Sequence, residues 1–256
     1  MCRWLGYIGP PTTPNQYLYE DRFSLIEQSH TARKSKSVVN GDGFGLGWYA
    51  EQAEPGLFRD ILPAWSDENL KSLATHIKSG LFFAHVRAAT STSTNRTNCH
   101  PFRHDNSLFV HNGQIGGYQT VRRKVEALIH DDLYTERLGT TDSEALFLGL
   151  KSLMKGSQPF CESTQELIHL VVNMMRSHNI TEPFRYTSAY SEGDKIYAVR
   201  YSSDKLAPSL FYSKIEGGWL LVSEPLDNQL NHWQLVPANH TIELCRHSAE
   251  PVIKAL

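Results

Sequence analysis

The spacing of hydrophobic residues divides this sequence into three parts. In the first part, period-two alternation and short apolar runs predict strands at residues 2–8, 42–50, 81–86 and 107–110. A short helix is predicted at residues 23–31, and leucine, alanine and isoleucine at helical spacing predict another at residues 67–79. We expect Gly9, Pro10 and Pro11 to end the first strand, because glycine and proline interrupt regular structure.

The middle and the end of the chain have different patterns. Apolar residues at helical spacing predict three consecutive helices at residues 118–130, 142–155 and 162–178. After Pro183, short alternating runs separated by glycine-containing turns predict an antiparallel meander, with strands at residues 186–190, 196–201, 210–212, 219–222 and 233–236. Strands, then helices, then strands predict an α+β protein.

Composition narrows the class of protein. The 256 residues, 40% hydrophobic and 20% charged, suit one globular domain, which we expect to span residues 1–256. A net charge of -2 with dispersed lysine and arginine predicts no nucleic-acid partner. No apolar segment approaches the roughly 20 residues that cross a bilayer, and no signal-peptide core follows Leu5. We therefore predict a soluble cytoplasmic protein without a membrane partner.

The cysteines and histidines do not have the spacing of a metal site. The four cysteines lie far apart and form no CxxC pair. His100 and His104 are four residues apart, but Pro101 prevents the helix that would place both on one face. We expect no metal and no cofactor.

Cys2 is the first candidate for chemistry. Removal of Met1 places a thiol and a free α-amine on the same residue, so that a nucleophile and its general base arrive together. An α-amine with a pKa of about 7.7–8 can accept the thiol proton near neutral pH. If Met1 is retained, a peptide bond blocks that amine and this chemistry fails.

Polar residues follow two of the predicted strands. Asn112 and Gly113 are typical of a hairpin turn, but an asparagine amide and the next glycine N–H can also stabilise an oxyanion. Arg87 follows an apolar strand, where binding a substrate carboxylate would compensate its burial. Asp142 can bind a substrate ammonium group, or it can belong to the N-terminal cap of a helix.

Together these residues resemble the class II glutamine amidotransferases, a branch of the N-terminal-nucleophile (Ntn) hydrolases. The resemblance covers about the first 150 residues and rests on Met1-Cys2, Asp42-Gly43-Phe44-Gly45, His85-Val86-Arg87-Ala88-Ala89-Thr90, His111-Asn112-Gly113 and Thr141-Asp142-Ser143-Glu144. The segments at residues 1–6 and 39–49 look most like the stand-alone subgroup. That subgroup includes the γ-glutamyl amidohydrolase of ergothioneine biosynthesis and a subunit of a fungal glutathione-degrading complex.

The resemblance implies a fold and a set of roles. The fold would be a four-layer αββα sandwich, with two antiparallel sheets between helical layers. Cys2 would be the nucleophile, Asn112 and Gly113 the oxyanion hole, Arg87 the ligand of the α-carboxylate and Asp142 the ligand of the α-amine. Thr90 would line the same pocket. For His85, His100 and Asp42, pocket-lining or supporting roles and purely structural roles both stay open.

Two departures from the family narrow the expected activity. Ala88 follows Arg87, where synthase-linked members carry tryptophan or a similar bulky residue, and we expect no synthase domain after residue 256. We therefore predict hydrolysis of glutamine or a γ-glutamyl amide through a thioester on Cys2. The alternatives are a glutaminase subunit that delivers ammonia to a separate synthase, and a catalytically silent module that binds γ-glutamyl compounds.

The leaving amine is not specified by these motifs. Arg3, Trp4 and the aromatic pair Trp48 and Tyr49 are the candidates to contact it. Ammonia, a cysteinyl compound or another amine would all leave the same acyl-enzyme.

Overall fold

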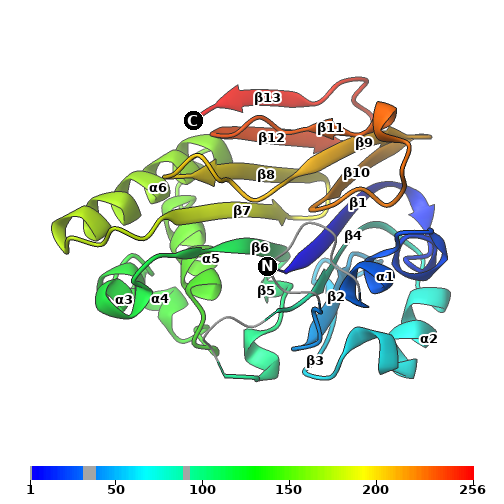
Figure 1. Cartoon of the computed structure of the whole chain (residues 1–256), viewed down its shortest axis with the longest axis horizontal. Helices are drawn as coiled ribbons and strands as arrows, with labels where there is room; N and C mark the ends of the chain where they lie inside the picture. The colour runs from blue at the N-terminus through cyan, green and yellow to red at the C-terminus, as the bar shows by residue number, and fades with distance from the viewer. Residues whose placement is uncertain (1, 31–38, 89–92) are drawn as a thin grey trace.

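The chain folds into two antiparallel β-sheets that pack face to face between layers of helices (Figure 1). The structure is a computed structural model, and it describes residues 2–30, 39–88 and 93–256. This is the α+β sandwich that the resemblance implied. No helix among the described residues has both the length and the apolar character needed to span a bilayer.

The larger sheet has seven strands and holds the N-terminal strand in its interior. In spatial order the strands are β11 (Gln234–Leu235), β9 (Phe211–Ile215), β10 (Gly218–Val222), β1 (Arg3–Thr12), β4 (Ser79–Val86), β2 (Phe44–Trp48) and β3 (Gly56–Asp60). The start of β1 pairs with the end of β4, where Arg3 lies opposite Val86, and with the end of β10, where Leu5 lies opposite Val222. Hydrogen-bonded neighbours on both sides hold β1 in place.

The smaller sheet has six strands and presents an open edge at one end of β6. In spatial order the strands are β13 (Val252–Ala255), β12 (His240–Cys245), β8 (Lys195–Ser202), β7 (Phe184–Ser191), β6 (Ser107–Ile115) and β5 (Phe102–His104). β5 pairs with β6 only up to Phe109, whereas β7 pairs with β6 as far as Ile115. Among the described residues, the last six of β6 therefore have a strand neighbour on one side only.

Helices cover the outer face of each sheet. On the smaller sheet lie α3 (Tyr118–Glu126), α4 (Asp131–Tyr134), α5 (Asp142–Leu153) and α6 (Phe160–Ser177). On the larger sheet lie a π-helical turn (Gln16–Glu20), α1 (Leu25–His30), a 3-10 turn (Ala64–Ser66) and α2 (Glu68–His76). Two further 3-10 turns are formed by Arg96–Asn98 and Leu230–His232. The order of layers is therefore helices, sheet, sheet, helices.

Side-chain alternation along the strands assigns each residue to one of the cores. On β6, Leu108 and Val110 pack between the sheets, whereas Phe109 and Ile115 face the helices. On β1, Trp4 and Ile8 pack between the sheets, whereas Leu5 and Tyr7 face α1 and its neighbours. Asn112 therefore points toward the larger sheet, and Arg3 points away from the smaller one.

The structure corrects two expectations about strand ends. β1 does not stop at Gly9, Pro10 and Pro11 but continues to Thr12. Its register against β4 shifts between Ile8 and Thr12, so no regular ladder there requires the N–H groups that proline lacks.

His111, Asn112 and Gly113 were expected beyond the end of a strand, with a hairpin as one interpretation. They lie inside β6. The pattern also missed β3, β5, β12 and β13, each of which has only three to six residues and lies at or next to a sheet edge.

Candidate active site

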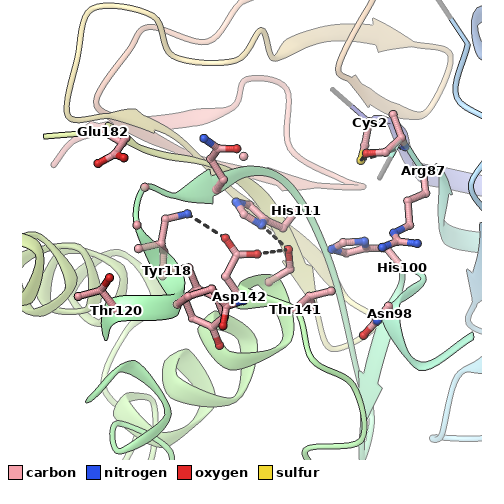
Figure 2. A pocket seen from close by; sticks show the side chains of 18 residues that line it. Cys2, Arg87, Asn98, His100, His111, Tyr118, Thr120, Thr141, Asp142 and Glu182 are labelled. Atoms are coloured by element: carbon pink, nitrogen blue, oxygen red, sulfur yellow. Dashed lines mark hydrogen bonds between the residues drawn. The ribbon is translucent and has the colours of Figure 1, made fainter. Parts of the chain in front are cut away.

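A cleft of about 400 Å³ lies where the starts of β1 and α5 approach the end of β6. Its lining includes Cys2, Arg87, Gly113 and Asp142. Figure 2 shows Cys2, Arg87 and His100 at one end of the cleft, with Asp142 nearer its middle and Glu182 at the other end. Residues from both sheets and from the first turn of a helix thus meet in one cavity.

The Cys2 thiol is half-buried at one end of the cleft. Its Sγ atom lies 3.5 Å from the Ala88 nitrogen, which donates to it, and 3.6 Å from the Ala88 carbonyl oxygen. Burial raises the pKa of the Cys2 thiol, and the Ala88 backbone, Arg87 and Arg3 partly oppose this effect. The net increase means that the thiol needs a base to become a nucleophile at neutral pH.

Asn112 links β6 to the residue that carries this thiol. Its Nδ2 atom donates to the Cys2 carbonyl oxygen over 3.0 Å, across the junction of the two sheets. An amide nitrogen carries two N–H groups, so this bond leaves Asn112 a second donor. Gly113 follows it directly and lines the cleft.

Gly113 occupies a position that admits no side chain. Its φ is +156°, and a Cβ atom there would lie 1.9 Å from the Arg185 carbonyl oxygen of β7. The N–H of Ile115, two residues further along β6, donates to Asp142 and therefore points to the edge that β5 leaves open. Alternate N–H groups of a strand point the same way, so the Gly113 N–H faces that edge as well.

Asp142 is the first residue of α5, and its carboxylate faces the cleft (Figure 2). Its Oδ2 atom accepts from the Ile115 nitrogen over 2.8 Å, and Oδ1 accepts from the Ser143 hydroxyl over 3.4 Å. The helix cap is Thr141, whose hydroxyl accepts from the Glu144 nitrogen over 3.2 Å. Asp142 is therefore a first-turn residue tied to β6, and another side chain caps the helix.

Arg87 is buried immediately after β4 and is held by the main chain of Asp42 and Gly43. The Arg87 nitrogen donates to the Gly43 carbonyl over 2.8 Å, and the Asp42 nitrogen donates to the Arg87 carbonyl over 3.1 Å. Arg87 Nη1 also donates to the Asp42 carbonyl over 3.2 Å. Asp42 thus supports Arg87 through its backbone. Thr90, which was expected to line the same pocket, lies outside the described residues.

Three buried histidines lie at the cleft: His100 and His111 line it, and His85 packs against His100. The rings of His85 and His100 stack with centroids 4.3 Å apart, and His100 lines the cavity. Burial lowers the pKa of His85 to about 3 and that of His100 well below its ordinary value, so both rings are neutral at pH 7. They therefore add polar surface without charge beside Arg87.

His111 connects β6 to α5, a role that the sequence analysis did not assign. Its Nδ1 atom lies 2.8 Å from the Ser143 hydroxyl, and Nε2 lies 3.4 Å from the Arg185 carbonyl. Burial lowers the pKa of His111, although nearby Asp142 opposes the effect. The signal was present in the alternation of β6, which turns His111 to the same side as Phe109 and Ile115, toward the helices.

Arg3 and Trp4, two of the candidates to contact a leaving amine, are not among the residues that line the cleft. Trp4 is buried between the sheets, and Arg3 is buried on the opposite side of β1. Tyr49 donates its hydroxyl to the Ser191 carbonyl over 2.7 Å, at the far end of β7 from the cleft. Within the ranges that the structure describes, no group of three histidine, cysteine or acidic side chains is placed to hold a metal ion.

Two solved structures share this arrangement of layers. A glutamine aminotransferase class-II domain protein from Silicibacter pomeroyi aligns with a TM-score of 0.76 and 33% identity, over 100% of this chain and 99% of that one. The glutamine phosphoribosylpyrophosphate amidotransferase of Bacillus subtilis aligns with a TM-score of 0.62 and 13% identity, over 100% of this chain and 49% of that one. The latter is similar in fold alone, which is the Ntn-type sandwich.

Sequence comparisons agree with the fold. Residues 21–210 match the family model of class II glutamine amidotransferases. Over 95% of its length the chain is 30% identical to the probable glutamine amidotransferase DUG3 of Saccharomyces cerevisiae, and it covers 82% of that protein. The chain therefore belongs to the class II glutamine amidotransferases, a family of enzymes that act on amide bonds. It is also 31% identical to the γ-glutamyl-hercynylcysteine sulfoxide hydrolase of Mycobacterium tuberculosis, over 45% of this chain and 50% of that protein.

We predict that Gly113→Ala destabilises the protein, whereas Gly149→Ala does not. The Gly113 substitution forces a methyl group against a β7 carbonyl, and we expect it to lower the free energy of unfolding by about 2 kcal/mol or more. In α5, a Cβ on Gly149 meets its neighbours at 3.6 Å, so alanine there should stabilise by up to about 1 kcal/mol. Urea unfolding measures both, and equal effects would contradict the close approach at Gly113.

A second prediction concerns acid sensitivity. His85 has an ordinary pKa of 6.5 that burial lowers to about 3, so below pH 6.5 the unfolded chain binds a proton that the folded chain excludes. Stability due to this group is complete above pH 6.5 and falls by about 2 kcal/mol between pH 7 and pH 5. His85→Leu should therefore flatten the dependence of unfolding free energy on pH.

Phe83→Leu is the matched control, because Phe83 is buried on the same strand and does not titrate. It should lower stability without changing the slope against pH. An unchanged slope in His85→Leu would show that His85 does not exclude the proton.

Proposed function

We propose that this protein hydrolyses glutamine or another γ-glutamyl amide through a γ-glutamyl-thioester on Cys2. The observation that carries the proposal is the single cleft in which Cys2, Arg87, Gly113 and Asp142 meet. Its first requirement is removal of Met1, which frees the α-amine of Cys2. We also propose that residues 1–256 act as one amidotransferase domain.

The first half-reaction forms the acyl-enzyme. The α-amine of Cys2 accepts the thiol proton, and the sulfur attacks the γ-carbonyl carbon of the substrate. A base is required because burial raises the pKa of the thiol. Negative charge then develops on the carbonyl oxygen, where the second N–H of Asn112 and the N–H of Gly113 can donate to it. Collapse of this intermediate breaks the C–N bond, and the ammonium form of the α-amine protonates the leaving amine.

The second half-reaction returns the enzyme to its starting state. The leaving amine departs, and water takes its place next to the thioester carbonyl. The α-amine accepts a proton from water, and the oxygen attacks the carbonyl carbon with the same oxyanion donors in place. The C–S bond breaks, the sulfur recovers its proton and glutamate is released. The net reaction is an amide plus water giving glutamate plus an amine, without a cofactor.

Recognition of the γ-glutamyl half is assigned to two charged side chains. Arg87 has a planar guanidinium suited to the α-carboxylate, and Asp142 has a carboxylate suited to the α-ammonium group. We include Thr90 as a lining residue on sequence grounds. We assign supporting roles to Asp42, whose main chain holds Arg87, and to His85 and His100, whose rings stack on each other. The name of the mycobacterial relative, a γ-glutamyl compound hydrolase, also supports this substrate class.

The residues of the cleft specify the γ-glutamyl half of the substrate, but they do not specify the leaving amine or a protein partner. Delivery of ammonia to a separate synthase is the alternative function, and glutaminase activity that rises when a synthase is added would favour it. A silent γ-glutamyl-binding module would bind substrate without releasing glutamate. A cytoplasmic location stays a prediction from the sequence.

We predict that Cys2→Ala lowers glutamate release by more than about a thousandfold while γ-glutamyl ligand still binds. Mass spectrometry of wild-type protein exposed to a panel of γ-glutamyl amides should detect loss of Met1 and an acyl group on Cys2. Cys161→Ala is the control, because that half-buried thiol lies on α6. Turnover retained by Cys2→Ala would exclude the thioester.

A further prediction tests the assigned ammonium site. Asp142→Asn keeps an acceptor for the Ile115 N–H but removes the charge, so we expect kcat/KM for glutamine to fall roughly 30-fold. The same variant should hydrolyse an analogue lacking the α-amine about as well as wild type does. Glu182→Gln, which removes a charge from the exposed end of the cleft, is the control. Equal losses on both substrates would refute the assignment of Asp142.

A further inference from the structure

We propose that Arg3 and Glu224 are a positioning pair that fixes the backbone of Cys2, and with it the thiol and the α-amine. This inference rests on the proposed function of Cys2. It assigns a role to two residues that lie outside the cleft and do not touch substrate. Neither residue is among the site residues that the family resemblance implies.

The pair contacts Cys2 at its carbonyl oxygen. Arg3 Nε lies 2.8 Å from Glu224 Oε2, and Arg3 Nη1 donates to the Cys2 carbonyl oxygen over 3.1 Å. Asn112 Nδ2 donates to the same oxygen over 3.0 Å. Arg3 belongs to the larger sheet and Asn112 to the smaller one, so donors from both sheets hold one carbonyl group. A fixed carbonyl fixes the plane of the peptide that follows Cys2.

Hydrogen bonds fix the backbone around Glu224. Gln28 of α1 donates from Nε2 to the carbonyls of Glu224 and Pro225, at 3.2 Å each. The preceding residue, Ser223, exchanges hydrogen bonds with Trp4: its nitrogen donates to the Trp4 carbonyl, and its Oγ accepts from the Trp4 nitrogen, at 3.0 Å each. These hydrogen bonds therefore connect β1 to the segment after β10 that carries Glu224, and connect that segment to α1.

Burial makes this pair sensitive to the loss of either partner. The side chains of Arg3 and Glu224 are 4% and 6% exposed. Removing one charge leaves the other buried without this ionic partner. The geometry favours arginine, because its rigid guanidinium donates from two separate nitrogens, Nε to Glu224 and Nη1 to the Cys2 carbonyl. The N–H groups of a lysine ammonium all share one nitrogen.

Arg3 and Arg87 are two of the cations that act on the thiol, together with the N-terminal amine. Both arginines oppose the increase that burial causes in the pKa of Cys2. Arg3 therefore has two separable effects, one of charge on the thiolate and one of geometry on the Cys2 backbone. Lysine at this position keeps the first effect and loses the second.

The test compares Arg3→Met, Arg3→Lys and Glu224→Gln by steady-state kinetics and by thermal unfolding. For Arg3→Met and Arg3→Lys we expect kcat to fall roughly tenfold to a hundredfold. KM should change by less than about threefold, because Arg87 and Asp142 are untouched. Glu224→Gln, which keeps a neutral acceptor for Arg3, should show a smaller loss of kcat. Lys195→Met and Glu243→Gln are the controls, since that ion pair joins β8 to β12 away from the cleft.

A second measurement does not depend on any substrate. The rate at which iodoacetamide alkylates Cys2 at pH 7, followed by mass spectrometry of the N-terminal peptide, should fall about three- to tenfold in Arg3→Met and stay near wild type in Arg3→Lys. Full kcat in Arg3→Lys, or losses explained by the unfolded fraction alone, would overturn the positioning role. If wild-type protein hydrolyses no γ-glutamyl amide, the proposed function fails. The alkylation experiment is independent of that result, and an unchanged alkylation rate in Arg3→Met would overturn the action of Arg3 on Cys2.

Discussion

The position of β1 between β4 and β10 is the constraint on which the site depends. Chain termini usually fray, because they have few neighbours. Here Arg3 lies opposite Val86, and the next residues pair on both sides, so the chain is ordered almost from its first residue. Cys2, the proposed nucleophile, is held in register with the rest of the cleft because the strand after it has hydrogen-bonded neighbours on both sides.

Both sheets contribute residues to the cleft. The larger sheet supplies the proposed nucleophile, Cys2, just before β1, and the proposed carboxylate ligand, Arg87, just after β4. The smaller sheet supplies the proposed oxyanion donors from β6, and α5 supplies Asp142. The hydrogen bond from Asn112 to the Cys2 carbonyl joins the two sheets at this residue. Relative movement of the sheets would therefore displace the proposed nucleophile and the proposed oxyanion donors together.

Much of this arrangement could be predicted from the sequence. The order of strands and helices followed from hydrophobic spacing, and the motifs around Cys2, Arg87, Asn112 and Asp142 indicated the family. The interior of β6 was missed because polar and glycine residues at positions 111–113 break its apolar pattern, although the backbone pairing with β7 continues through them. Short edge strands such as β3 and β13 carry too few buried residues to produce a clear signal.

The sequence predicts the direction of the Arg3 side chain but not its partner. Alternation along β1 places it on the same side as Leu5 and Tyr7, so its direction was available from the sequence. Its partner was not, because Glu224 lies more than two hundred residues away and follows β10. Pairings of such long range depend on the assembled sheet and leave no local pattern.

The central position of β1 also has a consequence for how the protein is made. β1 is synthesised first, but β10, one of its two neighbours, emerges only after residue 218. The first strand must wait for nearly the whole chain, and contacts of such long range slow folding. The ladder between β1 and β4 can therefore form long before the ladder between β1 and β10. The larger sheet is completed only when the last part of the chain becomes available.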